Sequence, residues 1–477
     1  MSKNFGALLD AQLQRHSTKP ALVWDGGALT FDELRRRVDD FAGALAAKGV
    51  GAGDRIALTI GNHWAFAVAL LAGWKLGATV APLDVLLKDE ERADIVADLG
   101  STVLVRAEDV GTEPASPSAA LASTTGRAAA LILYTSGSTG RPKGALLSHA
   151  ALELAIESWA GPVMALTRDD VVLATLPLAH SFGLNGALLA PLLRGATVVL
   201  VDRFAPEAVV EAIHRHRVTV FPGVATMFRR LLDSTELAAA DLSSVRIGVS
   251  GAAPCPWALA QEWRARTGIR IVRGYGMTEL FRPISYQAAD TTESPDAIGR
   301  AVPGVEIRIV DDAGRSVTDG ETGELLIKSP SAMECYLNAP EETREVLADG
   351  WFHTGDLARV STDGLVTIVG RKRERILRGG YSIFPSEVEA VLLTHPAVAE
   401  AAVVGVPHGE LGEDVAAFVT LRAGAQAAPE ELIGHCKDRL APFKYPRRLT
   451  VLDALPKAAT GKVLKQRLAA PSGETLD

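Results

Sequence analysis

The stretch Tyr134-Thr135-Ser136-Gly137-Ser138-Thr139-Gly140-Arg141-Pro142-Lys143-Gly144 decides how the rest of this chain is interpreted. It follows a short apolar run, Ala130 to Leu133, which predicts a buried strand that ends at turn-forming residues. Its glycines let backbone N–H groups converge without a Cβ in the way, and its hydroxyls and cations add further donors. Such a concave donor surface suits a polyphosphate.

A flexible Gly/Ser linker is the alternative interpretation of the same stretch. The tripeptide Arg141-Pro142-Lys143 argues against it, because a linker needs neither a stiffened backbone nor cations at its end. The P-loop of other nucleotide-binding proteins is also excluded, since no Gly-Lys-Ser/Thr occurs here. The loop runs instead into a second apolar segment, Ala145 to Leu147.

Length and composition restrict the class of protein. A chain of 477 residues with 48% hydrophobic and 22% charged residues predicts a globular protein of two or more domains. The net charge of −8 gives no reason to expect nucleic acid or an anionic membrane as a partner. The scattered cysteines Cys255, Cys335 and Cys436 lack metal-ligand spacing and fit a reducing cytoplasm.

No secretory or membrane-spanning segment is expected. The N-terminus lacks a secretory apolar region. Residues 56–74 and 171–193 have no charged side chain over membrane-spanning length, but polar and helix-breaking residues interrupt both. The predicted location is therefore cytoplasmic.

The order of apolar segments predicts an α/β fold with a second, smaller unit. Strand, helix and strand alternate through residues 30–82 and again through 196–221, as in a parallel sheet covered by helices. Thr30 and Glu33 form a predicted capping box for the first of these helices. After about Thr292 short alternating segments predict antiparallel strands, and from about residue 372 a compact α+β unit follows. We expect domains at 1–371 and 372–477.

A second chemical motif is Tyr275-Gly276-Met277-Thr278-Glu279, which follows an apolar strand. A tyrosine on a glycine-flanked turn can place its ring against a purine, and the Glu279 carboxylate is a hard oxygen ligand of the kind Mg²⁺ prefers beside a triphosphate. The alternative is an ordinary strand–turn–helix, with the glutamate favoured by the helix dipole.

These motifs, together with residues 251–254, 350–356 and 455–462, occur in the order found in the adenylate-forming superfamily, which the chain resembles from about Thr30 to Leu468. That superfamily includes acyl-CoA synthetases, amino-acid adenylation domains and luciferases. The resemblance implies a large N-terminal domain of βα layers with a β-rich portion, and a small mobile C-terminal α+β domain. It also implies Mg²⁺, with ATP and coenzyme A as co-substrates.

The resemblance assigns roles residue by residue. The catalytic residues are Lys462, Thr278 and Glu279, and Glu279 and Thr135 hold the metal. The ATP and AMP contacts are Thr135, Ser136, Gly137, Ser138, Thr139, Gly140, Lys143, Gly251, Ala252, Ala253, Tyr275, Asp356 and Arg371. An ionised carboxylate such as Asp356 can accept both hydroxyls of a ribose, and the Lys462 ammonium can meet charge that builds on the α-phosphate. A plain turn at Asp356 and a surface lysine at 462 are the alternatives.

The resemblance also implies a pocket and a moving domain. The acyl pocket comprises His180, Phe221, Val224, Ser250, Met277, Leu280, Phe281 and Arg282. Gly379 and Gly380 line the path of coenzyme A, and Arg373 is the hinge. For Arg282 two readings stay open: an acid on a neighbouring segment pairs with it, or it recognises a second polar group on the substrate.

The expected reaction has two steps: a carboxylate attacks the α-phosphate of MgATP, and coenzyme A then displaces AMP to give a thioester. The expected partners are a fatty or aryl acid, ATP and coenzyme A, and a homodimer is left open. An adenylating enzyme that loads an amino acid or a carrier protein is the rival, although residues 221–226 offer no acid for a substrate ammonium. A non-catalytic adenylate-binding protein ranks lower, and a Gly-x-Ser-x-Gly hydrolase elbow is absent.

Overall fold

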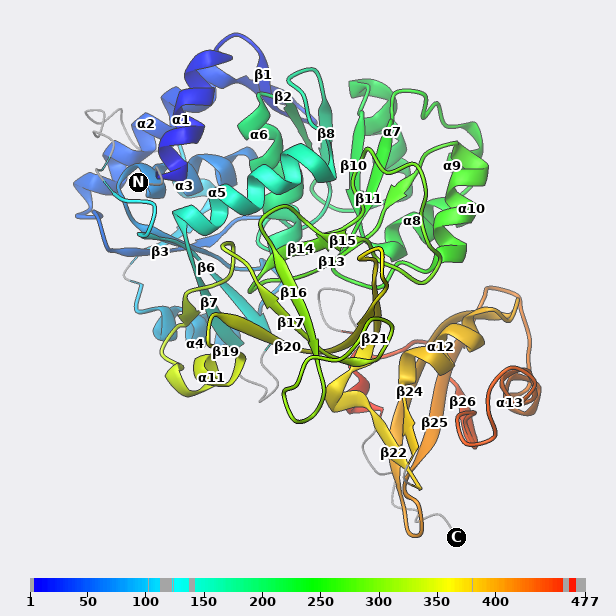
Figure 1. Ribbon diagram of the computed structural model, residues 1–477. Coiled ribbons are helices and arrows are strands. Elements are labelled where there is room, and N and C mark those ends of the chain that lie inside the picture. Colours follow the sequence, from blue (N-terminus) through cyan, green and yellow to red (C-terminus); the bar gives the residue numbers. More distant parts are fainter. Residues whose placement is uncertain are drawn as a thin grey trace. The chain divides into compact units, whose positions relative to one another are not determined.

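The computed structural model describes residues 4–101, 103–111, 122, 124–136, 142–379, 381–457 and 463–468. The chain divides into two compact units: Met1–Ile307 with Ile327–Phe352, and Arg308–Leu326 with His353–Asp477. Figure 1 labels most of their helices and strands. The predicted boundary at 371/372 marks the proposed hinge and stays a prediction. The compact units divide elsewhere, because residues 356–360 and 366–371 pair as one hairpin within the second unit.

A six-stranded sheet in the first unit contains the strand that leads to the phosphate-loop stretch. Its order is β18-β7-β6-β4-β3-β5, and β3, β4, β5 and β6 run parallel while β7 and β18 are antiparallel to their neighbours. The strands are β3 (Arg55–Thr59), β4 (Thr79–Pro82), β5 (Val103–Arg106), β6 (Ala129–Ser136), β7 (Pro142–Ser148) and β18 (Cys335–Tyr336). The parallel α/β prediction is confirmed.

A seven-stranded sheet completes the frame of the first unit. Its order is β12-β11-β10-β8-β9-β1-β2, parallel throughout except for the β1–β2 hairpin. Because the carboxyl ends of parallel strands meet at one edge, residues that follow β8, β10, β11 and β12 lie close together. The strands are β1 (Pro20–Trp24), β2 (Gly27–Thr30), β8 (Val171–Ala174), β9 (Thr197–Leu200), β10 (Val220–Gly223), β11 (Ile247–Ser250) and β12 (Ile271–Val272).

Helices cover both sheets. The predicted capping box at Thr30 and Glu33 starts α2. The described helices of this unit are α1 (Phe5–Arg15), α2 (Phe31–Ala47), α3 (Trp64–Lys75), α4 (Asp89–Leu99), η1 (Ala107–Asp109), α5 (His149–Ser158), η2 (Trp159–Val163), η3 (Gly183–Leu189), α6 (Ala190–Arg194), α7 (Pro206–His216), α8 (Ala225–Asp233), α9 (Glu236–Ala239), α10 (Trp257–Thr267) and α11 (Pro340–Val346). Among the described helices, not one combines the length and apolar character needed to cross a bilayer.

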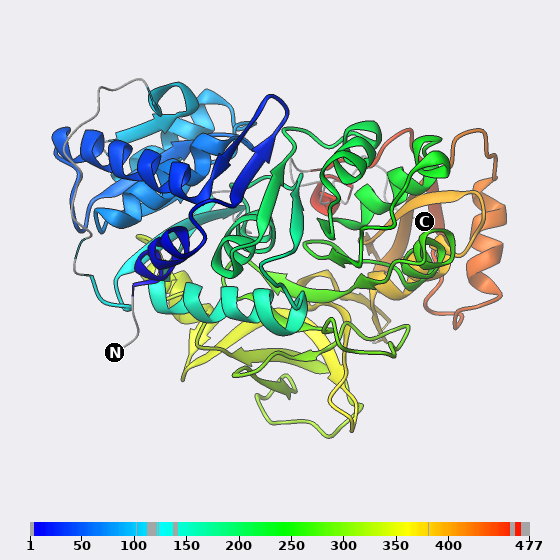
Figure 2. The same cartoon turned by 90° about the horizontal axis from the view of Figure 1, so that it is seen from above.

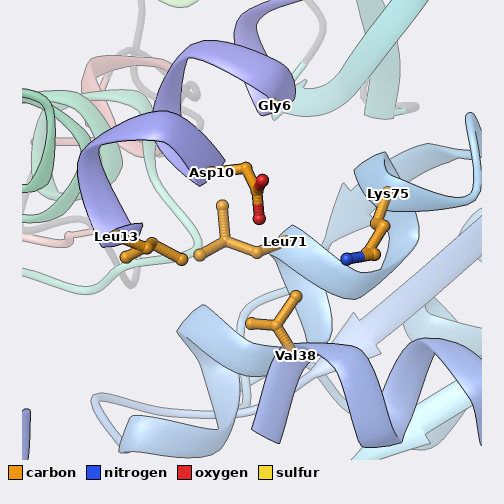
Figure 3. Close-up of a pocket in the computed structure, with 6 residues that line it drawn as sticks. All are labelled: Gly6, Asp10, Leu13, Val38, Leu71 and Lys75. Atoms are coloured by element: carbon orange, nitrogen blue, oxygen red, sulfur yellow. The ribbon is translucent and has the colours of Figure 1, made fainter. Parts of the chain in front are cut away.

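The N-terminal helices α1, α2 and α3, blue in Figure 2, pack against one another. Between them remains a cavity of about 10 Å³, toward which Asp10 and Lys75 point in Figure 3. It is lined by Gly6, Asp10, Leu13, Val38, Leu71 and Lys75. A space of this size holds at most one water molecule, so this helical layer is a packed support.

One side chain joins the two sheets. Asn62 follows β3, and its Nδ2 donates to three carbonyl oxygens at the ends of β8 and β9: Ala174 at 3.2 Å, Leu176 at 3.0 Å and Val201 at 3.1 Å. Its Oδ1 accepts the backbone N–H of Leu178 at 3.0 Å. Because this side chain is buried, these bonds satisfy polar groups that water does not reach.

A hairpin and a further sheet follow the parallel layers. β13 (Gly274–Met277) pairs antiparallel with β14 (Phe281–Ser285), which pairs with β15 (Arg300–Ala301). The predicted alternating segments are strands of a five-stranded sheet, where β19 and β21 both pair antiparallel with β20. Its strands are β16 (Glu306–Val310), β17 (Gly323–Lys328), β19 (Leu347–Ala348), β20 (Trp351–Val360) and β21 (Val366–Arg371).

The rest of the second unit has the predicted α+β character. Its sheet has the order β23-β22-β25-β24, with β26 parallel to β25, and apolar side chains of α12 and α13 share its core. The elements are η4 (Lys372–Glu374), β22 (Ile376–Arg378), β23 (Tyr381–Ile383), α12 (Pro385–Leu393), β24 (Val398–His408), β25 (Gly412–Leu421), α13 (Pro429–Lys437), β26 (Arg448–Val451) and η5 (Lys465–Arg467). All three cysteines are unpaired.

Candidate active site

The β6–β7 hairpin presents the two ends of the predicted phosphate loop. Thr135 lies opposite Lys143 in the ladder. A Cβ at Gly144 would come within 2.7 Å of the Ile132 side chain, so a glycine fits this crossing of strands. The remaining loop residues of the prediction, Gly137, Ser138, Thr139 and Gly140, lie outside the described residues, and of Ser136 only the backbone is described.

Glu279 is a buried carboxylate with a phenol as its partner. Its side chain is 8% exposed, and the Tyr336 hydroxyl donates to its Oε1 at 2.8 Å. The Lys143 ammonium lies 5.6 Å from the centre of the Tyr336 ring. The structure thus brings two predicted residues together through Tyr336, which the sequence motifs did not indicate.

The strand pairing explains why Tyr336 reaches this position. It lies on β18, opposite Ala145 of β7, so it comes from the edge strand beside the phosphate-loop hairpin. The backbone N–H of Met333 donates to the carbonyl oxygen of Glu279 at 2.8 Å and fixes the two segments together. No local sequence pattern around residue 336 predicts this contact, because the pairing joins segments almost 60 residues apart.

The β13–β14 hairpin positions Tyr275, Thr278 and Glu279. Residues 278–280 form a turn between two strands, so the alternative of a helix that starts near Glu279 is wrong. A Cβ at Gly276 would lie 2.0 Å from the Phe281 carbonyl oxygen, and Phe281 itself has a φ of 57°. A left-handed phenylalanine is costly, and such strain is often found at functional sites.

The predicted adenine loop leaves the carboxyl end of β11. Gly251 is buried, whereas Ala252 and Ala253 are exposed. Ala252 also has a left-handed backbone, with a φ of 63°. Small side chains on an exposed, bent segment leave its backbone groups accessible to a planar base.

The predicted acyl-pocket residues lie at several depths. Phe221 and Leu280 are fully buried, and the Phe221 ring centre lies 5.0 Å from that of Phe228 in the core. Val224 and Met277 are half-buried. Sequence reasoning did not indicate Trp159 and Phe182, whose stacked rings are 5.3 Å apart.

His180 and Arg282 both have polar partners. The His180 ring Nε2 lies 2.9 Å from Asp84 Oδ2, and this hydrogen bond holds the pKa of Asp84 below its usual range. Asp84 follows β4, so the pair also joins the two sheets. Arg282 bonds to Ser250 and to other backbone and hydroxyl oxygens, and no ion pair links it to a carboxylate of the described residues. The acid partner considered for it is not found there.

The predicted ribose pair belongs to the second unit. Asp356 is 3% exposed, and its Oδ1 lies 3.1 Å from Nε of Arg371, which sits opposite it in the β20–β21 ladder. The backbone N–H of Asp356 donates to the Thr354 hydroxyl at 3.0 Å. The carboxylate is therefore buried and charge-paired, and the backbone that carries it is held by Thr354.

Residues predicted for the hinge and the coenzyme A path are also in the second unit. Arg373 is exposed on η4. Gly379 has a φ of 55° and donates its N–H to the Leu411 carbonyl oxygen at 2.8 Å. The exposed ring of Tyr381 stacks on Phe443 at 4.3 Å. Gly380 lies outside the described residues.

Lys462 also lies outside the described residues, but the chain on either side of it is described. Lys457 and Val463 form an antiparallel bridge, and the Leu464 N–H donates to the Pro456 carbonyl oxygen at 2.8 Å. The ends of the predicted catalytic loop are therefore held next to each other.

The predicted metal ligands fit a magnesium ion that takes most of its oxygen ligands from phosphates and water. Across the part of the chain that the structure describes, no group of three His, Cys, Asp or Glu side chains could hold a metal. Mg²⁺ in nucleotide sites is usually held by one or two protein oxygens, with phosphates and waters completing the octahedron. Glu279 and Thr135 are suitable residues for this arrangement.

Comparisons with known proteins show the family to which the chain belongs. Residues 9–337 match the family model of the AMP-binding enzyme, and residues 387–462 match that of the AMP-binding enzyme C-terminal domain. A feruloyl-CoA synthase from Amycolatopsis sp is 37% identical, over 95% of this chain and 96% of the relative. A 4-coumarate–CoA ligase 5 from Oryza sativa subsp. japonica is 34% identical, over 93% and 90%.

Solved structures give the same result. ATP-bound MatB from Rhodopseudomonas palustris has a TM-score of 0.91 at 31% identity and covers 98% of each chain. A benzoate CoA ligase from Burkholderia xenovorans LB400 has a TM-score of 0.89 at 32% identity, with 98% of this chain and 99% of that one covered. The chain therefore belongs to the AMP-binding enzyme family, within the adenylate-forming superfamily that contains the acyl-CoA synthetases.

Proposed function

We propose that this chain joins a carboxylic acid to coenzyme A with the consumption of ATP. In the first step a carboxylate oxygen bonds to the α-phosphorus and the bond to pyrophosphate breaks, which gives an acyl-adenylate. In the second step the coenzyme A sulfur bonds to the acyl carbon, AMP leaves with the C–O bond electrons, and the thiol proton is released. Both steps depend on positioning and on neutralising charge rather than on a covalent protein nucleophile.

The buried Glu279–Tyr336 pair beside Lys143 is the observation that supports this proposal most directly. A carboxylate with one oxygen held by a phenol keeps its other oxygen available in a fixed orientation. Bound Mg²⁺ would supply neutralisation of the phosphate charge. Lys143 adds a cation at the end of the phosphate-loop hairpin, and Thr135 faces it across the ladder.

The remaining roles in the reaction are proposed for residues of the second unit. Asp356, oriented by Arg371, would accept the ribose hydroxyls. Lys462 would neutralise charge between the attacking carboxylate and the α-phosphate. Gly379 would line the path of coenzyme A, with its left-handed backbone close to Leu411.

We further propose that the acid has an apolar alkyl or aryl body. Most of the predicted pocket residues are apolar, and the Trp159–Phe182 stack adds aromatic surface near Gly251. Similar chains are named for ferulate, 4-coumarate, indoleacetate and long-chain fatty acids. An amino-acid substrate is less favoured, because residues 221–226 contain no acid to pair with its ammonium.

Product analysis tests the proposal. The full chain is incubated with ATP, Mg²⁺ and a panel of alkyl, aryl and amino acids, with and without coenzyme A, and products are identified by mass. We expect acyl-AMP without coenzyme A and the thioester with it. Acyl-AMP that never converts to a thioester would contradict the assigned acceptor, and no adenylate from any acid would contradict the function.

Lys462→Ala provides the internal control. It should lower adenylate formation by on the order of 10²–10³, as when one preorganised transition-state contact is removed. Thioester formation from presynthesised acyl-adenylate should be much less affected. Equal loss in both half-reactions would show that the lysine has only a structural role.

A further inference from the structure

Arg282 is a buried cation at the edge of the parallel sheet. It lies on β14 and is 5% exposed. Burial lowers the pKa of its guanidinium to about 9, so the group is still charged at neutral pH. A buried charge is costly unless hydrogen bonds satisfy it. The partners of Arg282 therefore indicate what it does.

Three oxygens of the protein accept hydrogen bonds from this guanidinium. Nε donates to Ser285 Oγ at 2.9 Å, Nη1 to the Ser250 carbonyl oxygen at 2.9 Å, and Nη2 to the Val272 carbonyl oxygen at 3.2 Å. The guanidinium carbon also lies 4.9 Å from the centre of the Trp159 ring. Hydrogen bonds from a charged donor are stronger than neutral ones, so this side chain holds the segments that carry its three acceptors firmly together.

The two carbonyl groups belong to the last residues of adjacent parallel strands. Ser250 ends β11 and Val272 ends β12, and the strands pair up to Val249 and Val272. Gly251 and the adenine loop follow β11 directly, and Tyr275 lies three residues beyond Val272. One guanidinium thus bonds to the exit points of both segments that are expected to contact the adenine.

The backbone around these exits leaves room for the guanidinium. A Cβ at Gly274 would lie 2.4 Å from Nη2, and a Cβ at Gly251 would lie 2.9 Å from Nη1. Real Cβ atoms essentially never approach so closely, and the buried Arg282 has little freedom to withdraw. The two glycines and the arginine therefore form one packed unit.

We propose that Arg282 is a positioning residue for the adenine nucleotide, which sets the adenine loop and the Tyr275 segment at the spacing that binds the base. The inference rests on the proposed function, because it assumes that this edge binds ATP and AMP. Without the guanidinium, two strand-end carbonyl groups lose their donor and the two segments can separate. Nucleotide affinity should then fall.

The test measures AMP affinity of the full chain by calorimetry, and the KM values for ATP and for the acid, at a temperature well below unfolding. Arg282→Gln should weaken AMP binding about 10–100-fold, as expected for lost hydrogen bonds to a charged group. Arg282→Lys should lie in between, and Ser285→Ala, which removes the Nε acceptor together with the donor to the Arg273 and Tyr286 carbonyl oxygens, should cost a few-fold. Because Arg282 is also predicted to line the acyl pocket, the KM for the acid is measured in the same variants, and a rise confined to that KM with AMP affinity unchanged would assign Arg282 to the acid instead.

Arg273→Lys is the matched control. Arg273 is equally buried, at 3% exposed, but bonds to Glu293, Ser294 and Pro295 instead of the strand ends. Its substitution should lower the melting temperature without a specific loss of AMP affinity. If Arg282→Gln does not fold, Arg282→Lys and Ser285→Ala decide the question.

Three results would overturn the inference. The first is unchanged AMP affinity in the folded Arg282 and Ser285 variants. The second is an equal loss in Arg273→Lys, which would mean that general destabilisation explains the effect. If the unsubstituted chain itself binds no AMP, the proposed function fails together with this inference, and that outcome is distinct from the other two.

Discussion

Single residues at this site owe their properties to partners distant in the sequence. Glu279 is oriented by the Tyr336 hydroxyl, and Tyr134, at the start of the phosphate-loop stretch, makes a similar bond to Asp98 Oδ2 at 2.8 Å. The two phenol–carboxylate pairs have the same chemistry but different surroundings, since Asp98 lies on α4. Matched substitutions in the two pairs can therefore separate the functional role of the Glu279–Tyr336 pair from its structural role.

Tyr336→Phe should raise the KM for MgATP about tenfold, because the Glu279 carboxylate loses the hydrogen bond that orients it. The KM for the acid should change little. Tyr134→Phe is the control and should lower stability without this change in KM. Equal KM values for MgATP in Tyr336→Phe and the unsubstituted chain would contradict a role for the phenol in metal or nucleotide binding.

His149 predicts a pH dependence of stability. It is fully buried beside Trp74, and neither ring nitrogen has a hydrogen-bond partner within the described ranges. Burial lowers its pKa from 6.5 to about 4. The unfolded chain therefore binds the additional proton between these values, and the free energy of unfolding falls as the pH drops from 6.5 toward 4, by up to about 3 kcal/mol.

Urea unfolding at pH 7.5 and pH 5 measures this contribution. His149→Phe should reduce the loss of stability between the two pH values, whereas a substitution at the exposed His214 should leave it unchanged. A pH dependence in His149→Phe equal to that of the unsubstituted chain would show that other groups cause the loss.

At the scale of helices and strands, some features could be predicted from the sequence and others could not. The βα alternation and the Thr30 capping box could be predicted, because they depend on local spacing and residue type. Tyr336 could not, because sheet pairing between β7 and β18 brings it to Glu279. The partners of Arg282 could not either, since two of them are backbone carbonyl groups, which every residue has.

Lys465 forms ion pairs with two glutamates, and these pairs link η5 to η4 and α12. The Lys465 Nζ lies 2.9 Å from Glu374 Oε2 and 2.7 Å from Glu389 Oε1. Burial works against the charged form of the lysine, but the two carboxylates outweigh it and raise its pKa. Because Lys465 lies three residues after Lys462, this contact anchors one end of the predicted catalytic loop.

Lys465→Met should lower the free energy of unfolding of the second unit by about 1–3 kcal/mol, because two partly buried carboxylates lose their counter-charge. Adenylate formation should fall as well, since the loop loses its anchor. Lys444→Met, which breaks a more exposed pair with Glu387, is the control and should cost at most about 1 kcal/mol. Equal stability losses in both variants would mean that the anchor has no special role.

At the scale of the whole molecule, the chain crosses between its two units three times, so neither unit is a continuous segment. Within the first unit, Asn62 and the His180–Asp84 pair bond across the two sheets. Both links lie at strand ends near predicted site residues. The sheets of this unit should therefore unfold together.

Asn62→Ala should lower the free energy of unfolding of the first unit by about 2–5 kcal/mol, because a buried N–H and three carbonyl groups lose a partner. Hydrogen exchange should show faster opening in β3, β8 and β9, with strands of the second unit unchanged. Asn62→Asp retains the acceptor for Leu178 but not the donors, and so separates the two contributions. A loss below about 0.5 kcal/mol, the level of an ordinary surface change, would contradict the link.

The packing of Arg282 against Gly251 and Gly274 also bears on the order in which these residues arose in evolution. Since a Cβ at position 274 would lie 2.4 Å from Nη2, an ancestor with alanine there could not accept this arginine without rearrangement. We therefore expect the glycine to have been in place before the arginine, and the arginine to disfavour a later change of the glycine. Among related chains, arginine at 282 should occur with glycine at 274, while glycine without the arginine should be permitted; reconstruction of ancestral sequences can check this order.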